Sequence, residues 1–322
     1  MITITRAPPY LTVQDNGRPH TLSAGVPRGG AMDSFAFRAG NAIVGNDFSD
    51  AVLEWALAGG AMRVDRDCAF CHTGAGAVVR VGADTIAPYT TAVLHAGDEI
   101  VVDQISSGRF IYFSFTGGVD VPILLGSRST YLPGRFGGFE GRMLRTGDTI
   151  AVGDPDARVP TPGFHCAADL LPRYESGIVH VTASPQSGHF DEAAWQIFTS
   201  SDYRVSSSSD RTGYRLEGAA VGKPPASLPS EAGCPGAIQV PGDGLPIALM
   251  ADAPTVGGYA KIAVVTEADL PILAQTRPGE RVRFELVTLE QSHRALRRRE
   301  SDLQTIRQLA LRSAAEGSEA TW

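Results

Sequence analysis

The chain has 322 residues, a formal net charge of −7 and an apolar content of 43%. This length accommodates two ordinary domains or one large β domain, and an acidic chain without a basic patch is not expected to bind nucleic acid. No apolar run is long enough to span a bilayer, and the opening residues show neither the charged region nor the apolar region of a secretory signal. We therefore expect a cytoplasmic protein, not bound to a membrane, whose four cysteines are reduced thiols.

The first half of the chain is predicted to be mostly β structure with one helix. Residues 2–5 and 10–13 predict an opening pair of strands, and Asp33 is the expected N-cap of a helix that runs through Ile43. From Leu53 to Ile150, Gly-Asp turns precede alternating apolar residues, a pattern typical of half-buried strands. The 36 glycines and 21 prolines agree with a fold of many short strands and turns.

The second half repeats this pattern after a break. Residues 153–173 contain four prolines with little periodicity and are predicted to link two β units. Beyond them we expect a strand at 177–181, short helices at 190–198 and 270–276, and a helix at 288–312 with an arginine-rich face and a frayed tail. The predicted organisation is an N-terminal half at 1–155, a linker at 156–174, a C-terminal half at 175–287, and a C-terminal helix and tail at 288–322.

The most unusual stretch runs from Gly236 to Ala263, with the sequence GAIQVPGDGLPIALMADAPTVGGYAKIA. Its apolar run, 246–251, predicts a buried strand between two polar turns. Lys261 is one of only two lysines in the chain, which otherwise carries its positive charge on arginine. The Gly257-Gly258 pair allows close approach of the backbone to a ligand or to another strand.

Several common functional motifs are absent or have a simpler interpretation. Cys68-Ala69-Phe70-Cys71-His72 matches a haem-attachment pattern, but it lies within a β run and predicts a pair of core cysteines. The other histidines show no metal-ligand spacing, so no metal site is expected. The sequence contains no G-x-x-x-x-G-K-[ST] loop and no G-x-S-x-G elbow, so any ATP must be bound in another way or by a partner chain.

Charged residues gather in three further loops: Asp15, Arg18 and Asp33; Arg128 with its neighbouring serines; and Asp210 and Arg211 with Tyr214. In one interpretation these residues only cap helices and turns and form local pairs. In the other they share a cleft that binds an anion or an amide and is closed by Asp243 and Lys261. Arginine forks suit carboxylates, a lysine with backbone N–H groups suits an oxygen that gains negative charge, and carboxylates accept protons.

Six motifs together resemble one family, over roughly residues 3 to 288. The motifs are T-V-Q-D-x-G-R, G-V-P-x-x-G-A-M-D, G-S-R-S-T-Y, S-D-R-x-G-Y-R-L-E-G, P-G-A-I-Q-V-P-G-D-G-x-P-I-x-L-M-A-D and T-x-G-G-Y-x-K-I-A. The family is that of the biotin-dependent carboxyltransferases and the 5-oxoprolinase C subunits, also labelled allophanate hydrolase subunit 2. The resemblance implies a mainly β, cyclophilin-like fold with two related barrel-like halves, a few short helices and a C-terminal helix.

The resemblance also implies an activity shared with partner chains. Stand-alone members are similar to one component of an ATP-dependent 5-oxoprolinase, which opens the lactam of 5-oxo-L-proline to give L-glutamate. Fused relatives transfer a carboxyl group from carboxybiotin to urea. The expected partners are a protein like the 5-oxoprolinase B subunit, of the allophanate hydrolase subunit 1 type, and a protein like the A subunit, with a small amide or lactam as substrate. ATP would be used by the complex, or carboxybiotin would be carried on another chain.

On this resemblance we assign Lys261, Asp243, Asp15 and Arg128 to catalysis. Lys261 and Arg128 would stabilise the substrate oxygen or carboxylate, and the aspartates would move protons or orient the cations. The expected substrate-binding residues are Arg18, Asp33, Asp210, Arg211, Tyr214, Gln239, Asp252, Thr255, Gly257, Gly258 and Tyr259.

Two other functions stay open at this point. The chain could be a regulatory binding module, since some relatives are described as acting on a signalling kinase, or a scaffold whose catalytic groups all lie on the B-type partner. The chain also departs from the family in ways that bear on substrate identity: Gly29 replaces a frequent serine and Leu245 a frequent glutamine. In the family segment Gln-Thr-Thr-Gly-Gly-Tyr-Pro-Lys, Pro254, Val256 and Ala260 replace the glutamine, the second threonine and the proline.

Overall fold

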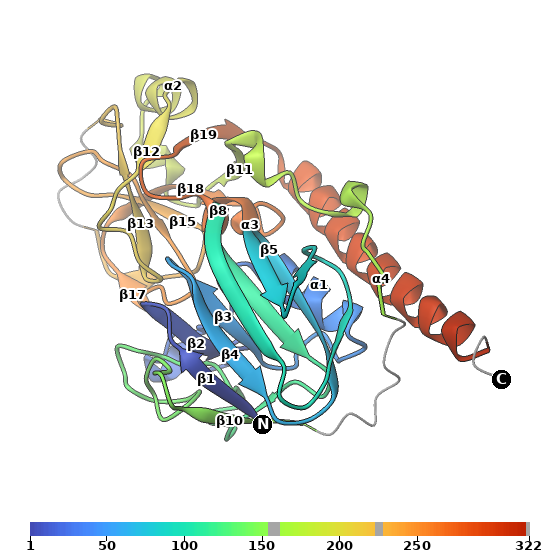
Figure 1. Ribbon diagram of the computed structural model, residues 1–322. Helices are drawn as coiled ribbons and strands as arrows, with labels where there is room; N and C mark the ends of the chain where they lie inside the picture. Colours follow the sequence, from blue (N-terminus) through green and yellow to red (C-terminus); the bar gives the residue numbers. More distant parts are fainter. Residues whose placement is uncertain (154–161, 223–227, 320–322) are drawn as a thin grey trace. The chain divides into compact units, whose positions relative to one another are not determined.

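A computed structural model describes residues 1–153, 162–222 and 228–319 (Figure 1). The chain forms two compact units: unit 1 contains Met1–Arg18, Asp33–Pro172 and Glu300–Trp322, and unit 2 contains Pro19–Met32 and Arg173–Arg299. The main division, after Pro172, falls inside the predicted linker at 156–174, of which residues 156–161 lie outside the described part. Unit 2 also takes a short early segment, and the C-terminal helix is divided between the units.

Unit 1 is built on a ten-stranded sheet in which β2, β3, β8, β4, β1, β10 and β9 follow one another, and β5 joins β6, β7 and β8. The long strand β8 pairs with β4 through its first residues, with β3 through its last residues, and with β5 along most of its length. The strands are β1 (Ile2–Arg6), β2 (Tyr10–Gln14), β3 (Val52–Ala56), β4 (Gly60–Val64), β5 (Cys68–Val81), β6 (Asp84–Ile86), β7 (Ala92–Leu94), β8 (Glu99–Phe115), β9 (Val119–Asp120) and β10 (Thr149–Val152).

The two opening strands form where the sequence predicts them, but their predicted pairing with each other is wrong. β1 pairs with β4 and β10, whereas β2 pairs with β3. Ala7-Pro8-Pro9 connects β1 to β2. Two consecutive prolines fix the backbone and remove two N–H donors, so this connection cannot form a tight hairpin and directs β2 to another neighbour.

The expected helix and the expected core cysteines of unit 1 are both confirmed. Helix α1 (Ser34–Ile43) begins at Asp33, whose carboxylate accepts hydrogen bonds from the N–H groups of Phe35 and Ala36. Its apolar face packs in one cluster with Cys71 and with Ile306 of the C-terminal helix. Cys68 and Cys71 are buried on β5, and burial raises the pKa of the Cys68 thiol to about 11, so it stays protonated at neutral pH.

Unit 2 is a closed barrel of seven strands in the order β11, β18, β15, β16, β13, β12 and β19. Phe198 of α2 stacks on Phe284 of β19 at a centroid distance of 4.9 Å, and both side chains are fully buried in its core. The strands are β11 (Ile178–Ala183), β12 (Tyr203–Val205), β13 (Gly213–Glu217), β15 (Ala237–Val240), β16 (Ile247–Leu249), β18 (Ala260–Val265) and β19 (Arg281–Leu286), with β14 (Glu231–Ala232) and β17 (Val256–Gly257) forming a separate two-stranded ribbon. The helices are α2 (Glu192–Ser200) and α3 (Leu270–Gln275), close to their predicted positions.

The C-terminal helix α4 (Leu289–Glu319) is longer than predicted (Figure 1). Residues 313–319 of the expected frayed tail continue the helix, with the strong helix formers alanine and glutamate at 314–316, and residues 320–322 of that tail lie outside the described part. In unit 1, Leu303 and Ile306 bury one side of α4 against α1. Beside them Arg38 of α1 forms two hydrogen bonds with Glu300, and this contact lowers the pKa of the Glu300 carboxyl.

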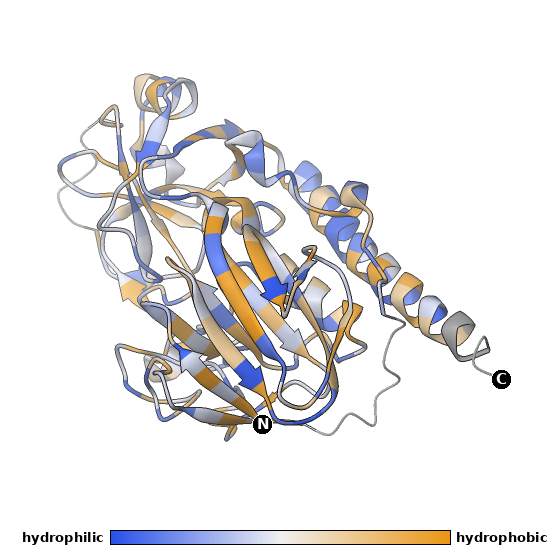
Figure 2. Cartoon of the chain, viewed as in Figure 1, coloured by the Kyte–Doolittle hydropathy of each residue, from blue (hydrophilic) through white to orange (hydrophobic). Residues whose placement is uncertain are grey.

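The fold class is as expected: the protein is mainly β, with two barrel-like sheets and few helices. Polar and apolar residues alternate along many of the strands and along α4, as Figure 2 shows. None of the described helices combines the length and the apolar content needed to cross a membrane.

Candidate functional site

Lys261 lies on β18 of the barrel in unit 2, and its side chain is almost completely buried at 6% exposure. Its ammonium group is 3.4 Å from Oε1 of Gln186 and 3.5 Å from Oε2 of Glu231. Its backbone N–H also donates to Oε1 of Gln186, at 2.9 Å. A buried ammonium needs such partners because its transfer out of water is otherwise strongly unfavourable.

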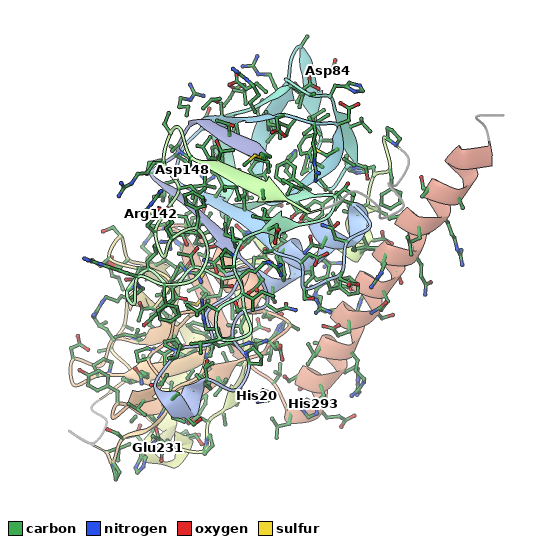
Figure 3. The ribbon with its side chains drawn as sticks, turned by 90° about the horizontal axis from the view of Figure 1, so that it is seen from below. His20, Asp84, Arg142, Asp148, Glu231 and His293 are labelled. Atoms are coloured by element: carbon green, nitrogen blue, oxygen red, sulfur yellow. The ribbon has the colours of Figure 1, made fainter. Side chains whose placement is uncertain are left out.

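The partners of Lys261 are themselves bonded to one another. The amide nitrogen of Gln186 donates to Glu231 at 2.7 Å, and the Ser184 hydroxyl both donates to the Lys261 carbonyl and accepts from the N–H of Gln186. Glu231 lies on the two-stranded ribbon and is 56% exposed, and Figure 3 labels it at the edge of unit 2. Its carboxylate therefore lies between the ammonium and the solvent.

The glycine-rich turn comes close to the same site. Gln239 is the register partner of Lys261 on β15, and a Cβ at Gly257 would lie only 2.8 Å from its amide nitrogen. Gly257 therefore lets the ribbon approach Gln239 more closely than a side chain would allow. Thr255 is half-buried, Gly258 accepts a hydrogen bond from Leu228 through its carbonyl, and Tyr259 is 52% exposed.

The predicted residues Arg211 and Asp252 form a buried bidentate ion pair, with N–O distances of 2.9 and 3.0 Å. The same guanidinium donates to the Gly30 carbonyl at 2.6 Å, and the Gly29 N–H donates to the Ala251 carbonyl at 3.1 Å. These contacts hold the early segment of unit 2 against the loop after β16. Arginine suits this arrangement because its planar fork can bond both oxygens of a carboxylate and still donate to a carbonyl.

Three other predicted residues of unit 2 bond to backbone groups. Asp210 and Asp243 are exposed and accept hydrogen bonds from backbone N–H groups two residues ahead, the arrangement of an Asx turn. Tyr214 is fully buried in the barrel, and its hydroxyl donates to the Ala274 carbonyl at 2.8 Å. For the two aspartates the contacts agree with the local interpretation of the charged loops, whereas the partner of Tyr214 lies 60 residues away in the sequence.

In unit 1, Asp15 is the centre of a buried cluster. Its Oδ1 atom accepts from the hydroxyls of Ser127 and Ser129 at 2.6 and 2.5 Å, and Oδ2 accepts from the Arg128 N–H at 2.6 Å. A further bond from the Gly17 N–H, at 2.8 Å, closes its own turn. Asp15 thus connects the turn after β2 to the Gly-Ser-Arg-Ser segment through one carboxylate.

The two arginines of this region reach different partners. Arg18 is 1% exposed, donates to the Ser129 carbonyl and lies 4.7 Å over the ring of Phe136. The guanidinium of Arg128 instead bonds to the Val121 carbonyl at 2.9 Å and pairs with Asp120 at 3.1 Å. Arg128 therefore bonds to Asp15 only through its own backbone N–H. Arg18 and Asp15 both bond to Ser129, Arg18 at the carbonyl and Asp15 at the hydroxyl.

A second buried network in unit 1 includes Asp33. Its N–H donates to the hydroxyl of Tyr112, which in turn donates to Glu54 at 2.8 Å. Tyr10 donates to the other oxygen of Glu54 at 3.1 Å. Burial, followed by the charge of Glu54, raises the pKa of Tyr112 far above its usual value, so this hydroxyl remains a hydrogen-bond donor.

The structure therefore sorts the predicted residues into local groups. Lys261 and Gln239 are together, Arg211 and Asp252 are together, and Asp15, Arg18 and Arg128 meet at Ser127–Ser129. Ser184, Gln186, Glu231 and Glu54 contact these groups or the Asp33 network, but sequence reasoning missed them. Of these four residues, only Glu54 stands out in the sequence, because it is the single charged residue in the apolar run Val52–Ala56 and a charge there indicates a buried polar contact. The catalytic and binding roles themselves stay predictions.

The Lys261 group has the chemistry to bind an electron-rich oxygen. One ammonium and the amides of Gln186 and Gln239 can donate hydrogen bonds to a lactam, a urea or the ureido ring of carboxybiotin. The Lys261 group is not suited to phosphate, because Lys261 is the single cation in this group and its ammonium is already near the Glu231 carboxylate. Among the described residues, no group of three or more His, Cys, Asp or Glu could hold a metal ion.

Comparisons with known sequences identify the family of the chain. The model of the carboxyltransferase domain, subdomain A and B, matches residues 24–286. The 5-oxoprolinase C subunit of Escherichia coli is 35% identical over 313 residues, which cover 97% of this chain and 98% of that protein. The Haemophilus influenzae protein of the same name is 34% identical, with 96% and 98% covered. The match to urea amidolyase of Lachancea kluyveri, 29% identical, covers 94% of this chain but 18% of that protein.

Solved structures show the same kinship. The urea amidolyase of Kluyveromyces lactis superposes with a TM-score of 0.87 at 28% identity, over 95% of this chain and 20% of that one. The urea carboxylase of the same yeast gives the same TM-score over 29% of its chain. Both relatives are therefore much longer proteins of which this fold is one part. The chain belongs to the family of the carboxyltransferase domain, subdomain A and B, whose members are parts of 5-oxoprolinases and urea amidolyases.

Proposed function

We propose that this chain is the C-type component of an ATP-dependent 5-oxoprolinase, which converts 5-oxo-L-proline to L-glutamate. The observation that carries the proposal is the nearly end-to-end match to the Escherichia coli 5-oxoprolinase C subunit, at 35% identity over 97% of this chain and 98% of the relative. A match of that extent leaves no large domain that the relative has and this chain lacks. The proposed partners are proteins like the B and A components of that enzyme, in the cytoplasm.

The reaction adds one water to the lactam. The C–N bond breaks, the hydroxyl joins the carbonyl carbon, and the ring nitrogen takes the proton. Lys261 is proposed to stabilise the negative charge that develops on the carbonyl oxygen, supported by the Gln186 and Gln239 amides. Because Glu231 lies 3.5 Å from the ammonium, the incoming oxygen would replace it. ATP, bound by the partner chains, would supply the free energy for lactam opening.

A second candidate is a biotin-dependent carboxyltransferase, supported by the TM-score of 0.87 with the Kluyveromyces lactis urea carboxylase. In that reaction the same residues would bind the oxygen of urea or of a related amide, and carboxybiotin would arrive on another chain. The two reactions share an amide-like carbonyl beside nitrogen. They differ in what the partner chains supply.

Reconstitution distinguishes these candidates. The chain would be combined with its A-type and B-type partners, ATP and 5-oxoproline, and glutamate would be measured. We expect glutamate to form only with all components present. Carboxylation of an amide by carboxybiotin, without any glutamate, would replace the first candidate by the second.

Lys261→Ala tests the assigned residue in the same assay. We expect the variant to assemble normally but to lose about 10²-fold or more in turnover, as when one oxyanion donor is removed. Gln196→Ala, on the exposed side of α2, is the matched control and should keep the original rate. If Lys261→Ala also keeps that rate, Lys261 does not stabilise the oxygen, and if Asp15→Ala and Arg128→Ala keep it as well, this chain is a scaffold whose catalytic groups lie on the partner.

A further inference from the structure

Unit 1 contains a cavity that the proposed function does not use. This cavity of about 630 Å³ opens between the Ala7–Pro9 connection and the loop of residues 132–146. Pro8, Leu132 and Met143 give it an apolar wall, and Arg135, Arg142 and Arg145 also line it. A volume of this size suits a small organic ligand rather than a single ion.

The three arginines differ in how many of their N–H donors are already hydrogen-bonded within the protein. Arg142 is fully engaged: it makes two hydrogen bonds to Asp148, at 2.6 and 3.0 Å, and one to Glu140 at 3.0 Å. Figure 3 shows Arg142 and Asp148 side by side. Within the described residues, the exposed guanidiniums of Arg135 and Arg145 form no hydrogen bond and no ion pair, although the charge of Arg145 helps to lower the pKa of Asp148. The two guanidiniums left open in the cavity are therefore cationic, and the carboxylate of Glu140, which also lines it, is paired with Arg142.

The loop that carries these arginines is shaped in advance. Arg135 and Glu140 both have left-handed backbone angles, with φ of 53° and 55°, which side chains adopt only at a cost. A Cβ at Gly141 would lie 2.2 Å from the Arg135 carbonyl, so the loop closes tightly on itself. Strained conformations of this kind persist only where the surrounding structure holds them.

The Asp15 cluster provides that support. Arg18 lies over Phe136 and donates to the carbonyl of Ser129, and Asp15 fixes Ser129 from the other side. Tyr131 and Phe136 bond to each other through their backbones across the start of the loop. The buried residues that sequence analysis assigned to a site thus hold the loop that presents Arg135.

We infer that this cavity is a binding site for an organic phosphate. A carboxylate is satisfied by one arginine fork, whereas the three terminal oxygens of a phosphate monoester can accept from two forks at once. The two open guanidiniums in this cavity therefore match a phosphate monoester better than a carboxylate. A phosphate monoester also carries a charge of about −1.5 to −2 at pH 7, which two cations can balance. The apolar wall would contact the organic part of the ligand.

Equilibrium binding to the isolated full-length chain tests this inference, with adenosine monophosphate as the probe. We expect saturable binding that weakens with added salt, whereas adenosine and L-glutamate should bind at least tenfold more weakly. Inorganic phosphate should also bind, but more weakly than the nucleotide because it cannot contact the apolar wall. The assay involves no turnover, so its failure is distinct from failure of the proposed function.

Substitutions locate the site. Arg135→Asn, which tolerates the left-handed backbone, and Arg145→Gln should each weaken nucleotide binding about tenfold or more, since a hydrogen bond to a charged group contributes roughly 1.5–3 kcal/mol. Arg135→Lys keeps the positive charge but loses the planar fork, so its nucleotide affinity should lie between that of the original chain and that of Arg135→Asn. Arg312→Gln, exposed on α4, is the control and should bind normally. The inference is overturned if the original chain shows no saturable binding, if adenosine or glutamate binds as well as the nucleotide, or if the control weakens binding equally.

Discussion

At the scale of single residues, the same residue type serves different purposes in this chain according to its neighbours. Asp210 and Asp243 are exposed and bond only to nearby backbone, whereas Asp15 and Asp252 are buried and bond to side chains far away in the sequence. Sequence reasoning placed all four in one site because an aspartate in a polar turn has the same local pattern in both cases. Only burial and partners separate the two roles.

Asp15 provides a direct test of these roles. Asp15→Ala leaves two serine hydroxyls and the N–H groups of Gly17 and Arg128 without their acceptor, so we expect a loss of about 3 kcal/mol in the free energy of unfolding of unit 1. Asp15→Asn keeps an acceptor oxygen and should lose less. Urea titration followed by fluorescence would measure both variants.

The reconstituted activity of Asp15→Asn then separates the two interpretations. A carboxylate that only holds Ser127–Ser129 in place can be replaced by an amide with a modest loss of rate. A carboxylate that accepts a proton cannot, because the amide is not basic. Native stability with turnover reduced by more than about 10²-fold would therefore show that Asp15 is a proton acceptor rather than a structural residue.

At the scale of elements, local sequence patterns predicted secondary structure well and pairing poorly. α1, α2 and α3 lie close to their expected positions because each has a cap, an apolar face or an early proline. The pairing of β1 with β4 and β10 depends on contacts between distant residues, which no local pattern contains. For the same reason Lys261 was found, whereas its partners Gln186 and Glu231, which come from segments 30 or more residues away, were not.

The packing of α4 gives a prediction at this scale. Ile306 is fully buried against α1, whereas Leu309, three residues later, is 39% exposed. Ile306→Ala should destabilise unit 1 by about 3 kcal/mol, because it removes buried methyl groups and leaves a cavity. Leu309→Ala should cost less than about 1 kcal/mol. Thermal unfolding would show this difference, and equal losses would contradict the contact of α4 with α1.

At the scale of the whole molecule, the chain has two separate cores. Unit 1 buries Trp55 and Phe113 at a centroid distance of 5.5 Å within its sheet. Unit 2 buries Phe198, Tyr203 and Phe284 together in its barrel. The sequence predicted two β units from a recurring turn and a proline-rich break. It could not predict that residues 19–32 join the second unit, because that depends on the bonds of Arg211 and Ala251 to Gly29 and Gly30.

Two cores of this kind should unfold as two cooperative units, since each unit buries its own apolar surface. Phe284→Ala should cost about 4 kcal/mol in unit 2 and leave the transition of unit 1 in place. Phe113→Ala should destabilise unit 1 and leave the transition of unit 2 in place. Each variant is therefore the control for the other. Differential scanning calorimetry would resolve the two transitions. If either substitution shifts both transitions by the same amount, the two units unfold as one, and the division of the chain at Pro172 has no thermodynamic counterpart.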